Sequence, residues 1–505
     1  MPQTVAILGA GPSGIAAARW LTHCGFDCTL FEQSGAIGGQ WNGNGAHSGV
    51  WPSMHTNTSR VMTAFSDLDY PSGTPVYPSN RQVRDYLDEY RRRFAPHAHV
   101  QLDSTVTSIR RNGERWAVRT AADQHDFDKV VVAAGRYGQP YVAPVPGVES
   151  FSGELGVRHS SRFRGAAPFR AKRVLVAGNG ISALEIACEL AMQGADFVAT
   201  TQRKPRYIVP KLVAGVPVDH QAFSRFAALG STVFPPEVQA QQFKQFLLRA
   251  NGHPAQVGAP APLDDGSAPS ITLNQHYLPL VAEGRIAGFP WVASISGRRA
   301  TFQNGDSAEF DAIIFATGFH LDLPYLDDEA RKVLGVAENA LTLYEYTFHP
   351  ELPGVAFIGM FHQLGPYFST LELQARWVAY AWSGAASLAS DQEMHAHLIT
   401  DHHAPVMMNV MALRFARHAG VDPALAHFPE LRRALFFGPL SAVSFRLSGP
   451  DALADAAERT LRAASAFGFL ADNNFSAEEQ QRIAMLNQAA GREVIPQAVA
   501  SAAAN

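Results

Sequence analysis

Residues 5–21 read VAILGAGPSGIAAARWL, and this stretch decides the fold. It starts with a short apolar run, passes through a cluster of glycines and continues with the apolar spacing of an amphipathic helix. The order predicts a buried parallel strand at residues 4–8, a tight glycine turn, and a helix at residues 13–23. Because residues 28–32 then have the pattern of a second strand, the whole stretch predicts a βαβ unit.

The same pattern occurs a second time, in VLVAGNGISALEIACEL at residues 174–190. Here it predicts a strand at residues 173–177, a helix at 181–193 and a strand at 196–201. Two such units predict an α/β protein with two Rossmann-like dinucleotide-binding domains. After residue 371 the pattern is mainly helical, so we expect a mainly helical C-terminal region as well.

Length and composition limit what this chain can be. It has 505 residues, of which 47% are hydrophobic and 17% are charged, which excludes a largely disordered protein and favours two or three packed domains. A formal net charge of −4 argues against nucleic-acid binding. The three cysteines cannot form a disulfide framework in a chain of this size, so we expect a reducing compartment and predict a cytoplasmic protein.

Three stretches lead to predictions about the ends and the middle of the chain. The apolar residues 5–21 are interrupted by glycines and have no cationic segment before them, so we reject a signal peptide. Because no other apolar run reaches the length needed to cross a bilayer, we also expect no membrane span. Residues 206–304 are predicted to be irregular, because Pro235, Pro236 and the proline- and glycine-rich residues 252–269 indicate surface excursions. The alanine-rich residues 489–505 either fray or form a docking arm.

The first glycine turn has the features of a dinucleotide site. Gly9, Gly11 and Gly14 allow a pyrophosphate to approach the backbone at the positive end of a helix. Glu32 closes the following strand, where a carboxylate can bind the hydroxyls of a ribose. A tight turn without a ligand is the alternative, and the strand, the helix and the acid together argue against it.

The second turn has a different charge pattern. Gly178, Gly180 and Ser182 belong to GNGISA, and no acid ends the next strand. Instead Arg203 and Lys204 follow it, and cations can bind a 2′-phosphate that a carboxylate would repel. The second unit is therefore predicted to prefer NADP to NAD, with a solvated cationic loop as the alternative.

A glycine pair after the first unit suggests which cofactor is resident. Gly39, Gln40 and Trp41 belong to the sequence GGQW, and two adjacent glycines let the backbone run flat along a large ligand. This favours a bound flavin in the first unit and a visiting nicotinamide cofactor in the second.

Taken together, these motifs resemble the flavin-containing monooxygenases, which are class B flavoprotein monooxygenases. The resemblance covers residues 5–384. It is carried, in order, by the turn from Gly9, Glu32, GGQW at 38–41, TNTSRVMTAFSDLDYP from Thr56, the turn from Gly178, FATGF at 315–319 and STLELQARW from Ser369. It implies an FAD-binding domain at residues 1–164 and 306–384, an NADP-binding domain with an irregular insertion at 165–305, and the helical region at 385–505.

The resemblance also implies an activity. NADPH would pass hydride to FAD, O2 would add to give a C4a-hydroperoxide, and the nitrogen or sulfur of a small molecule would take one oxygen atom. Asn57, next to Thr56, matches the asparagine beside the reactive edge of the flavin, and its amide can both donate and accept hydrogen bonds. Thr317 and Gly318 match the segment that links the nucleotide domain back to the flavin domain.

The same comparison assigns two residues near the ring. Gln363 belongs to FHQLG at residues 361–365, a segment expected beside the flavin. Ser369 precedes a helical pattern whose start can face the flavin pyrimidine, where the helix dipole stabilises negative charge. An ordinary helix N-cap is the alternative for this serine, and both interpretations can hold.

One family fingerprint, FxGxxxHxxx(Y/F), is present with a different spacing. Phe151, Gly153, His159 and Phe163 supply its letters, but five residues instead of three separate the glycine from the histidine. A hydrogen-bonded hinge role is favoured for His159 over acid–base catalysis. The related Baeyer–Villiger enzymes would show tryptophan where Phe163 stands.

Other functions and partners stay open or are rejected. Ketone oxygenation of the Baeyer–Villiger type is one alternative, and a non-oxygenating NADPH-linked flavoprotein in electron transfer or redox sensing is another. A metal site is conceivable at a cluster of four histidines, His395, His397, His402 and His403. Because no cysteine or HxxxH spacing accompanies them, we favour a solvated helix end and predict no metal. A homo-oligomeric contact through the helical part from residue 385 is left open.

Overall fold

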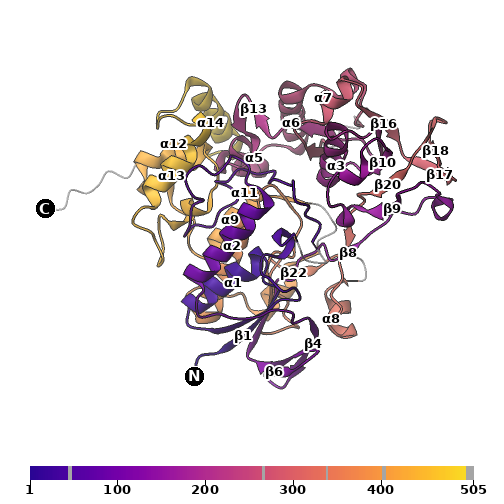
Figure 1. The fold of residues 1–505 in the computed structure, drawn as a ribbon. Helices are drawn as coiled ribbons and strands as arrows, with labels where there is room; N and C mark the ends of the chain where they lie inside the picture. The colour runs from indigo at the N-terminus through magenta and orange to yellow at the C-terminus, as the bar shows by residue number, and fades with distance from the viewer. Residues whose placement is uncertain (44–47, 264–267, 337–338, 401–404, 496–505) are drawn as a thin grey trace.

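The computed structural model describes residues 1–43, 48–263, 268–336, 339–400 and 405–495. Its core consists of two separate five-stranded parallel sheets, each with helices against it. In Figure 1 the first sheet lies at the bottom, the second at the upper right, and the C-terminal helices at the upper left. The predicted α/β fold with two Rossmann-like units and a helical C-terminal region is confirmed.

The first sheet is built around the N-terminal strand, and all its neighbouring strands run parallel. Every side chain of its central strand after the first residue is buried, as expected for a strand covered on both faces. In spatial order the strands are β23 (Val355–Phe357), β7 (Lys129–Val132), β1 (Thr4–Leu8), β2 (Asp27–Phe31) and β3 (His99–Gln101).

The second sheet repeats this plan with strands from distant parts of the chain. In spatial order they are β16 (Ile286–Pro290), β11 (Phe197–Gln202), β10 (Arg173–Ala177), β20 (Ala312–Phe315) and β9 (Gly156–His159). Each sheet has one glycine turn followed by a helix, α1 (Pro12–His23) in the first and α3 (Ile181–Met192) in the second. The predicted strands and helices of both units are therefore present, within one or two residues at their ends.

The division into cofactor-binding domains stays a prediction, but two segments near its boundaries belong to the other sheet. Residues 156–159 and 312–315 were assigned to the FAD-binding part, whereas β9 and β20 pair in the second sheet. The reason is that β20 pairs with β10 and β9 pairs with β20, so the chain leaves the first unit before residue 156 and returns after residue 315.

The prediction that residues 206–304 are irregular is wrong in part. This stretch contains α4 (Val218–Ala222), α5 (Arg225–Val233), α6 (Pro236–Asn251) and α7 (Tyr277–Ala282), besides short strands. The two adjacent prolines do not break structure, because Pro235 is the N-cap of α6 and Pro236 its first residue, where no backbone N–H is needed. Leu247 of α6 then packs into a small apolar cluster with Tyr207 and Val209.

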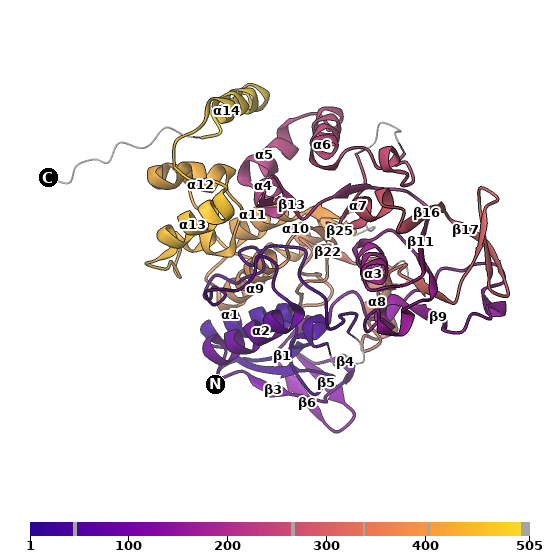
Figure 2. The ribbon, with the colours of Figure 1, turned by 45° about the horizontal axis from the view of Figure 1, so that its top comes forward.

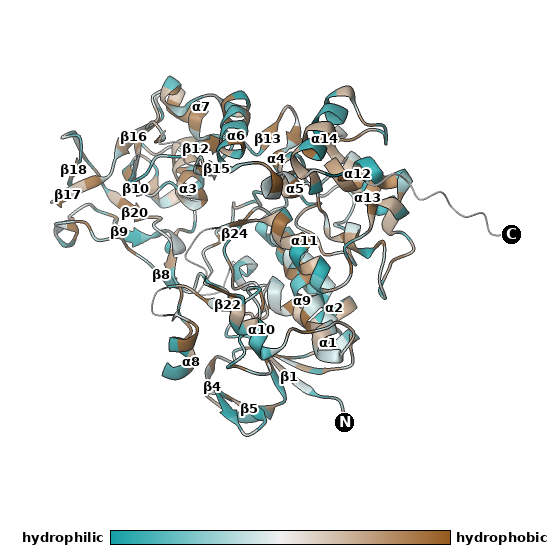
Figure 3. Cartoon of the chain, turned by 180° about the vertical axis from the view of Figure 1, so that it is seen from behind, coloured by the Kyte–Doolittle hydropathy of each residue, from teal (hydrophilic) through white to brown (hydrophobic). Residues whose placement is uncertain are grey.

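The outer layer of the first unit is a small antiparallel sheet. It consists of β4 (Val106–Asn112), β5 (Arg115–Thr120) and β6 (Gln124–Phe127). Figure 3 shows mainly hydrophilic residues along β4 and β5, in keeping with a sheet that faces solvent on one side. Within the residues described, no helix combines the length and the apolar character needed to cross a bilayer.

The C-terminal helices pack on the first unit and on the insertion. Helix α9 (Phe368–Ser383) is buried along its first thirteen residues and lies against α1 and α11 (Met408–His418). Figures 1 and 2 both show α12 (Arg432–Phe437), α13 (Ala456–Ser465) and α14 (Ala477–Ala490) grouped beside α5. The C-terminal region is therefore part of the core, and its residues 496–505 lie outside the described part of the chain.

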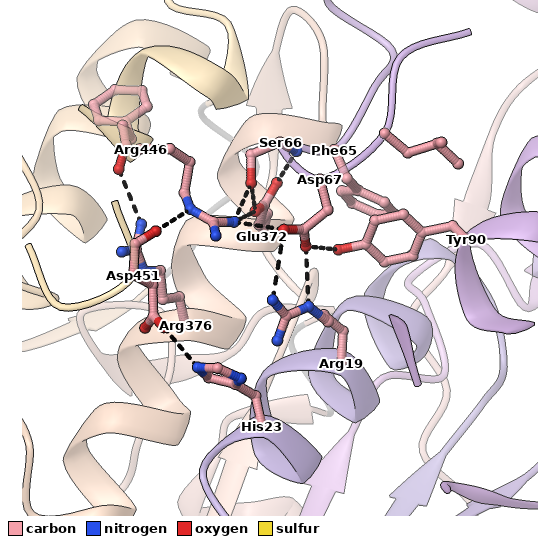
Figure 4. A network of polar contacts seen from close by, with 12 residues as sticks. Arg19, His23, Phe65, Ser66, Asp67, Tyr90, Glu372, Arg376, Arg446 and Asp451 are labelled. Carbon is pink, nitrogen blue, oxygen red and sulfur yellow. Dashed lines mark hydrogen bonds and ion pairs between the residues drawn. The ribbon is translucent and has the colours of Figure 1, made fainter. Parts of the chain in front are cut away.

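A buried network of charged side chains joins this region to the first unit (Figure 4). Asp67 lies at its centre, with Arg19 of α1 at 3.0 Å, Arg446 at 2.8 Å and the Tyr90 hydroxyl at 3.0 Å. Arg446 also donates a hydrogen bond to the Ser66 hydroxyl at 2.7 Å. Asp67 and Arg446 are each 4% exposed, so these pairs are nearly screened from water.

A second carboxyl group, that of Glu372 on α9, completes the network. It accepts hydrogen bonds from the backbone N–H of Ser66 at 2.7 Å and from the Ser66 hydroxyl, and lies 3.9 Å from Arg446. Burial and the neighbouring charge of Asp67 raise the pKa of Glu372. For Asp67 burial raises the pKa but the guanidinium groups of Arg19 and Arg446 outweigh it, so the net direction is down. The network thus depends on its arginines.

Candidate cofactor-binding site

At the first glycine turn, the following helix packs very close to the turn. Gly9 has a φ of +100°, and a Cβ atom there would lie 2.7 Å from the carbonyl oxygen of Ala133. A Cβ atom on Gly14 would lie 1.8 Å from the carbonyl oxygen of Gly9. Only glycine fits these positions, and as a result the N-terminal end of α1 is presented at the edge of the sheet, where its N–H groups and dipole attract an anion.

Glu32 lies at the end of the second strand, as the sequence predicts for a ribose-binding acid. It is 5% exposed, and its two carboxylate oxygens accept hydrogen bonds from the backbone N–H groups of Ala10 and Ser34, both at 2.9 Å. These bonds fix the carboxylate against the turn. Each oxygen still has a free lone-pair direction with which to accept a hydrogen bond from a ribose hydroxyl.

The glycine pair lies directly on this turn. A Cβ atom on Gly39 would be 2.8 Å from the Cα of Gly11, and the Gly38 N–H donates to the Ala10 carbonyl at 2.9 Å. Trp41 packs against the core of the first unit. The Gln40 side chain is exposed, and its oxygen accepts a hydrogen bond from Gly49 at 3.1 Å, so this amide holds its own loop together.

Thr56 and Asn57 differ in what their side chains do. The Thr56 hydroxyl donates to the Thr58 carbonyl at 2.7 Å and so stabilises the turn that carries Asn57. The Asn57 side chain is half-buried, and its Oδ1 atom is buried with no hydrogen-bond partner among the described residues. A buried amide oxygen without a partner costs free energy, which indicates that a ligand is needed here.

Gln363 and Ser369 show the same deficit. The Gln363 Nε2 donates to the Pro366 carbonyl at 2.6 Å, but its Oε1 atom is buried and unpaired within the described chain. Ser369 is completely buried, and its hydroxyl has no partner in the part of the protein that the structure covers. The N-cap interpretation of this serine is wrong, because α9 begins one residue earlier and its N-cap is Tyr367.

These three side chains carry groups that a flavin could satisfy. Asn57, Gln363 and Ser369 come from separate segments, yet each presents a buried oxygen that still needs a hydrogen-bond partner. Gly359, between β23 and α9, packs this part of the chain closely on α1, because a Cβ atom there would lie 2.2 Å from the hydroxyl of Ser13. A flavin, whose ring carries both N–H donors and carbonyl acceptors, matches such a set of groups.

The second glycine turn is more open than the first. Gly178 has a φ of +132°, and a Cβ atom on it would lie 2.4 Å from the Ala316 carbonyl oxygen. At Gly180, by contrast, a Cβ atom would meet no described atom within 4 Å. Ser182 is exposed in the first turn of α3. The start of this helix is thus accessible to a pyrophosphate.

Arg203 and Lys204 follow β11 and are exposed beside this turn. The Asn179 side chain of the turn donates to the Lys204 carbonyl, which ties the cationic loop to the glycine turn. The Arg203 guanidinium lies over the Trp291 ring, 5.2 Å from its centroid, in a cation–π contact that orients it. The structure therefore brings the two cations and the second turn together.

Thr317, Gly318 and His159 lie together where the chain leaves the second sheet. The His159 Nδ1 accepts a hydrogen bond from Ser161 N at 3.1 Å, so Nε2 carries the proton and donates to the Gly318 carbonyl at 3.0 Å. The Thr317 hydroxyl donates to the Tyr141 carbonyl at 2.5 Å. Burial lowers the pKa of His159, which keeps the ring neutral. These contacts support the hinge interpretation of His159.

Sequence reasoning missed several buried polar residues near the site. Arg136, four residues beyond the end of β7, is 4% exposed and donates to the Met360 carbonyl at 2.7 Å. Asp219 and His220 on α4 both contact Ser59, two residues from Asn57. The only sequence signal for them was an acid next to a histidine in a stretch that we predicted to be irregular.

The pKa values of Asp219 and His220 are displaced in opposite directions. Burial raises the pKa of Asp219 from 3.8 to about 6. The contribution of this carboxyl to the stability of the folded protein is therefore lost as the pH rises through that range. Burial and the charge of Arg60 lower the pKa of His220 from 6.5 to about 4. The contribution of this imidazole to the stability of the folded protein is therefore lost as the pH falls through that range. In the parent protein the two effects nearly cancel.

Single substitutions should separate these two effects. Between pH 4 and 6.5, the unfolding free energy of His220→Gln should fall by about 3 kcal/mol relative to that of the parent protein. The variant lacks the histidine, whose contribution to stability increases with pH over this range. Asp219→Asn should gain about 3 kcal/mol between pH 4 and 6. Urea unfolding across this pH range measures both differences. Parallel curves for a variant and the parent protein would contradict the assigned shift.

No cluster of three metal-ligating side chains is found in the described ranges 1–43, 48–263, 268–336, 339–400 and 405–495. His395 and His397 are exposed, and their Nδ1 atoms each contact a backbone carbonyl four residues earlier, at 2.9 Å. His402 and His403 lie outside the described residues. The absence of a metal ligand set at this helix stays a prediction.

Comparison with known proteins identifies one family and several relatives. The family model described as flavin-binding monooxygenase-like matches residues 2–466. The rabbit (Oryctolagus cuniculus) dimethylaniline monooxygenase (N-oxide-forming) 2 is 29% identical over 486 residues, which cover 89% of each chain. The S-allyl-L-cysteine S-oxygenase of Allium sativum superposes with a TM-score of 0.56 at 21% identity, over 97% of this chain and 93% of that one.

A second solved structure widens the comparison. Cyclohexanone monooxygenase with bound ε-caprolactone superposes with a TM-score of 0.62 at 16% identity, over 83% of this chain and 98% of that one. At such low identities the two solved structures establish a shared fold and nothing about the substrate.

Proposed function

Because this chain belongs to the flavin-binding monooxygenase-like family, we propose that it uses FAD and NADPH to transfer one oxygen atom from O2 to the nitrogen or sulfur of a small molecule. The enzyme class, a flavin-dependent monooxygenase, follows from the family. The observation that best supports the finer proposal is the pairing of two glycine turns with different charge, Glu32 after the first and Arg203 with Lys204 after the second.

FAD is assigned to the first unit and NADPH to the second. The resident site consists of the first glycine turn, Glu32, the loop at residues 38–41, and the unpaired oxygens of Asn57, Gln363 and Ser369. The visiting site is the open turn at Gly180 with its two cations. We propose the corresponding division of the chain, residues 1–164 and 306–384 for FAD and 165–305 for NADP, adjusted so that β9 and β20 count with the second sheet.

The protein needs few acids or bases for this chemistry. FAD, when bound, accepts hydride from NADPH and activates O2, so the chain has to bind, orient and exclude water. In this proposal the half-buried Asn57 orients the reacting edge with its amide. The hinge at Thr317 and Gly318, held by His159, keeps the two units in register.

The test of the function starts from the purified protein. It should be yellow or become yellow with added FAD, and it should consume NADPH faster when an amine or a thioether is supplied, with one oxygen atom added to the product. A preparation that stays colourless and does not bind FAD would end the proposal. Ester formation from a ketone would indicate Baeyer–Villiger activity, and NADPH consumption that yields only peroxide would indicate a non-oxygenating flavoprotein.

Arg203→Ala tests the assignment of NADPH to the second unit. The KM for NADPH should rise about tenfold, which corresponds to about 1.4 kcal/mol, because the 2′-phosphate loses its guanidinium partner. The KM for NADH, which lacks this phosphate, should change little. Arg299→Ala is a matched control, since this exposed arginine of β18 (Arg299–Phe302) pairs with Glu309 instead. Equal effects on both nucleotides would remove Arg203 from the phosphate site.

A further inference from the structure

A short helix of the insertion touches the candidate flavin site at two places. On α4, the Asp219 Oδ2 accepts a hydrogen bond from the Ser59 N–H at 2.6 Å, and the His220 Nε2 lies 3.0 Å from the Ser59 hydroxyl. Phe223, at the end of α4, packs on Gly365, where a Cβ atom would lie 2.5 Å from the ring. Ser59 and Gly365 are each two residues beyond a buried unpaired amide, those of Asn57 and Gln363.

The contact with Ser59 is deeply buried and only partly satisfied. Ser59 and His220 are fully buried, and Asp219 is 2% exposed. The Asp219 Oδ1 and the His220 Nδ1 have no hydrogen-bond partner among the residues described. Burying an acid and an imidazole in this state costs free energy that an apolar pair would not, so simple packing does not explain these residue types.

The three side chains do not form a nucleophilic triad. In such a triad the acid bonds to the Nδ1 of the histidine and orients it toward the hydroxyl. Here Asp219 bonds to the backbone of Ser59, and the His220 Nδ1 is unpaired within the described chain. The geometry holds the backbone and the side chain of Ser59 at once, which fixes the loop that carries Asn57.

The C-terminal region closes the far side of this contact. The Phe467 ring packs edge-on against His220 at 5.2 Å, and the Arg60 guanidinium lies 5.0 Å from the centroid of the same ring. Phe467 has a φ of +62°, a left-handed conformation that is costly for a phenylalanine and persists only where surrounding contacts enforce it. This residue is the first one beyond the span matched by the family model.

We propose that Asp219 and His220 are positioning residues that hold the Asn57 loop in place for oxygen transfer, with Phe467 as their support. This proposal rests on the proposed function, because it takes Asn57 to contact the flavin and the nicotinamide. The insertion that carries α4 and the C-terminal region that carries Phe467 thus act on the reaction through Ser59. Loosening the loop should let NADPH oxidation continue while more of its electrons end as peroxide.

A double-mutant cycle between Asp219 and Asn57 tests the proposal. Asp219→Ala should raise the peroxide released per NADPH about fivefold and weaken NADP⁺ binding, measured by calorimetry on the holoenzyme, by about the same factor. Asp219→Asn, which keeps an acceptor oxygen for the Ser59 N–H, should restore both values. In an Asn57→Ala background the Asp219→Ala substitution should add nothing to either quantity.

Additive effects in this cycle would overturn the proposal, because a residue that acts through Asn57 has no effect once the asparagine is removed. Asp422→Ala is the matched control. Asp422 pairs with Arg225 at 2.7 Å and also fastens the insertion to the C-terminal region, but it does not touch Ser59. A similar rise in peroxide in this control would mean general loosening and would also count against the proposal.

Two arrangements of the experiment keep the conclusion clear. If Asp219→Ala does not fold, Phe467→Leu, which removes the aromatic contact with His220, takes its place in the same cycle, with the same expected non-additivity. If the parent protein forms no oxygenated product, the proposed function fails, yet the NADP⁺ affinities still decide whether Asp219 acts through Asn57. Failure of the positioning proposal alone would appear as normal oxygenation with an additive cycle.

Discussion

Replacing Gly14 by alanine should give a colourless protein that no longer retains FAD. The new Cβ atom would lie 1.8 Å from the carbonyl oxygen of Gly9, a distance that no contact allows. Either α1 moves away from the turn or the turn opens, and both remove the N–H groups that the pyrophosphate needs. We expect a loss of about 3 kcal/mol in unfolding free energy, at the upper end of the cost of overpacking. Flavin absorbance and urea unfolding measure the two effects.

The second turn supplies a matched control for this prediction. Ala183 occupies the position in α3 that corresponds to Gly14 in α1, so the second turn already accommodates a Cβ atom there. Ala183→Gly should keep the flavin and cost only about 1 kcal/mol, the usual price of glycine in a helix. A Gly14→Ala protein as yellow and as stable as the parent would show that the turn does not need glycine at this position.

Arg446→Met should be the most destabilising single change in the buried network of Figure 4. Among the described residues, the substitution leaves Asp67 with only Arg19 as a charged partner, and it takes the nearby cation away from Glu372. Because a buried carboxylate without its partner is far more costly than a lost surface pair, we expect the unfolding free energy to fall by about 3–5 kcal/mol. Urea unfolding followed by tryptophan fluorescence measures this loss.

Two further measurements make the explanation specific. Arg462→Ala, which breaks a pair whose side chains are 57% and 53% exposed, should cost less than about 1 kcal/mol. Glu372→Gln should recover part of the stability of Arg446→Met, since it removes one of the buried carboxyl groups. An Arg446→Met variant no less stable than Arg462→Ala would mean that the network contributes little to the docking of the C-terminal region.

Much of the fold was readable from the sequence, because the features that specify it are local. The strands, turns and helices of both units lie in continuous stretches, and the apolar runs and glycine positions depend on neighbouring residues only. The sequence was misleading where a local signal has two meanings. Pro235 and Pro236 indicated irregular chain, whereas in the structure they start α6, since proline is tolerated before and at the first position of a helix.

The sequence by itself determined the two dinucleotide units, the acid after one and the cations after the other, and hence the choice of cofactors that we propose. Only the tertiary structure decided which polar groups meet and which are left without a partner. Ser59, His220 and Phe467 converge from three distant segments. Burial and long-range contacts depend on how the whole chain packs, and no local pattern records them, so the residues that position the site became visible only in the folded protein.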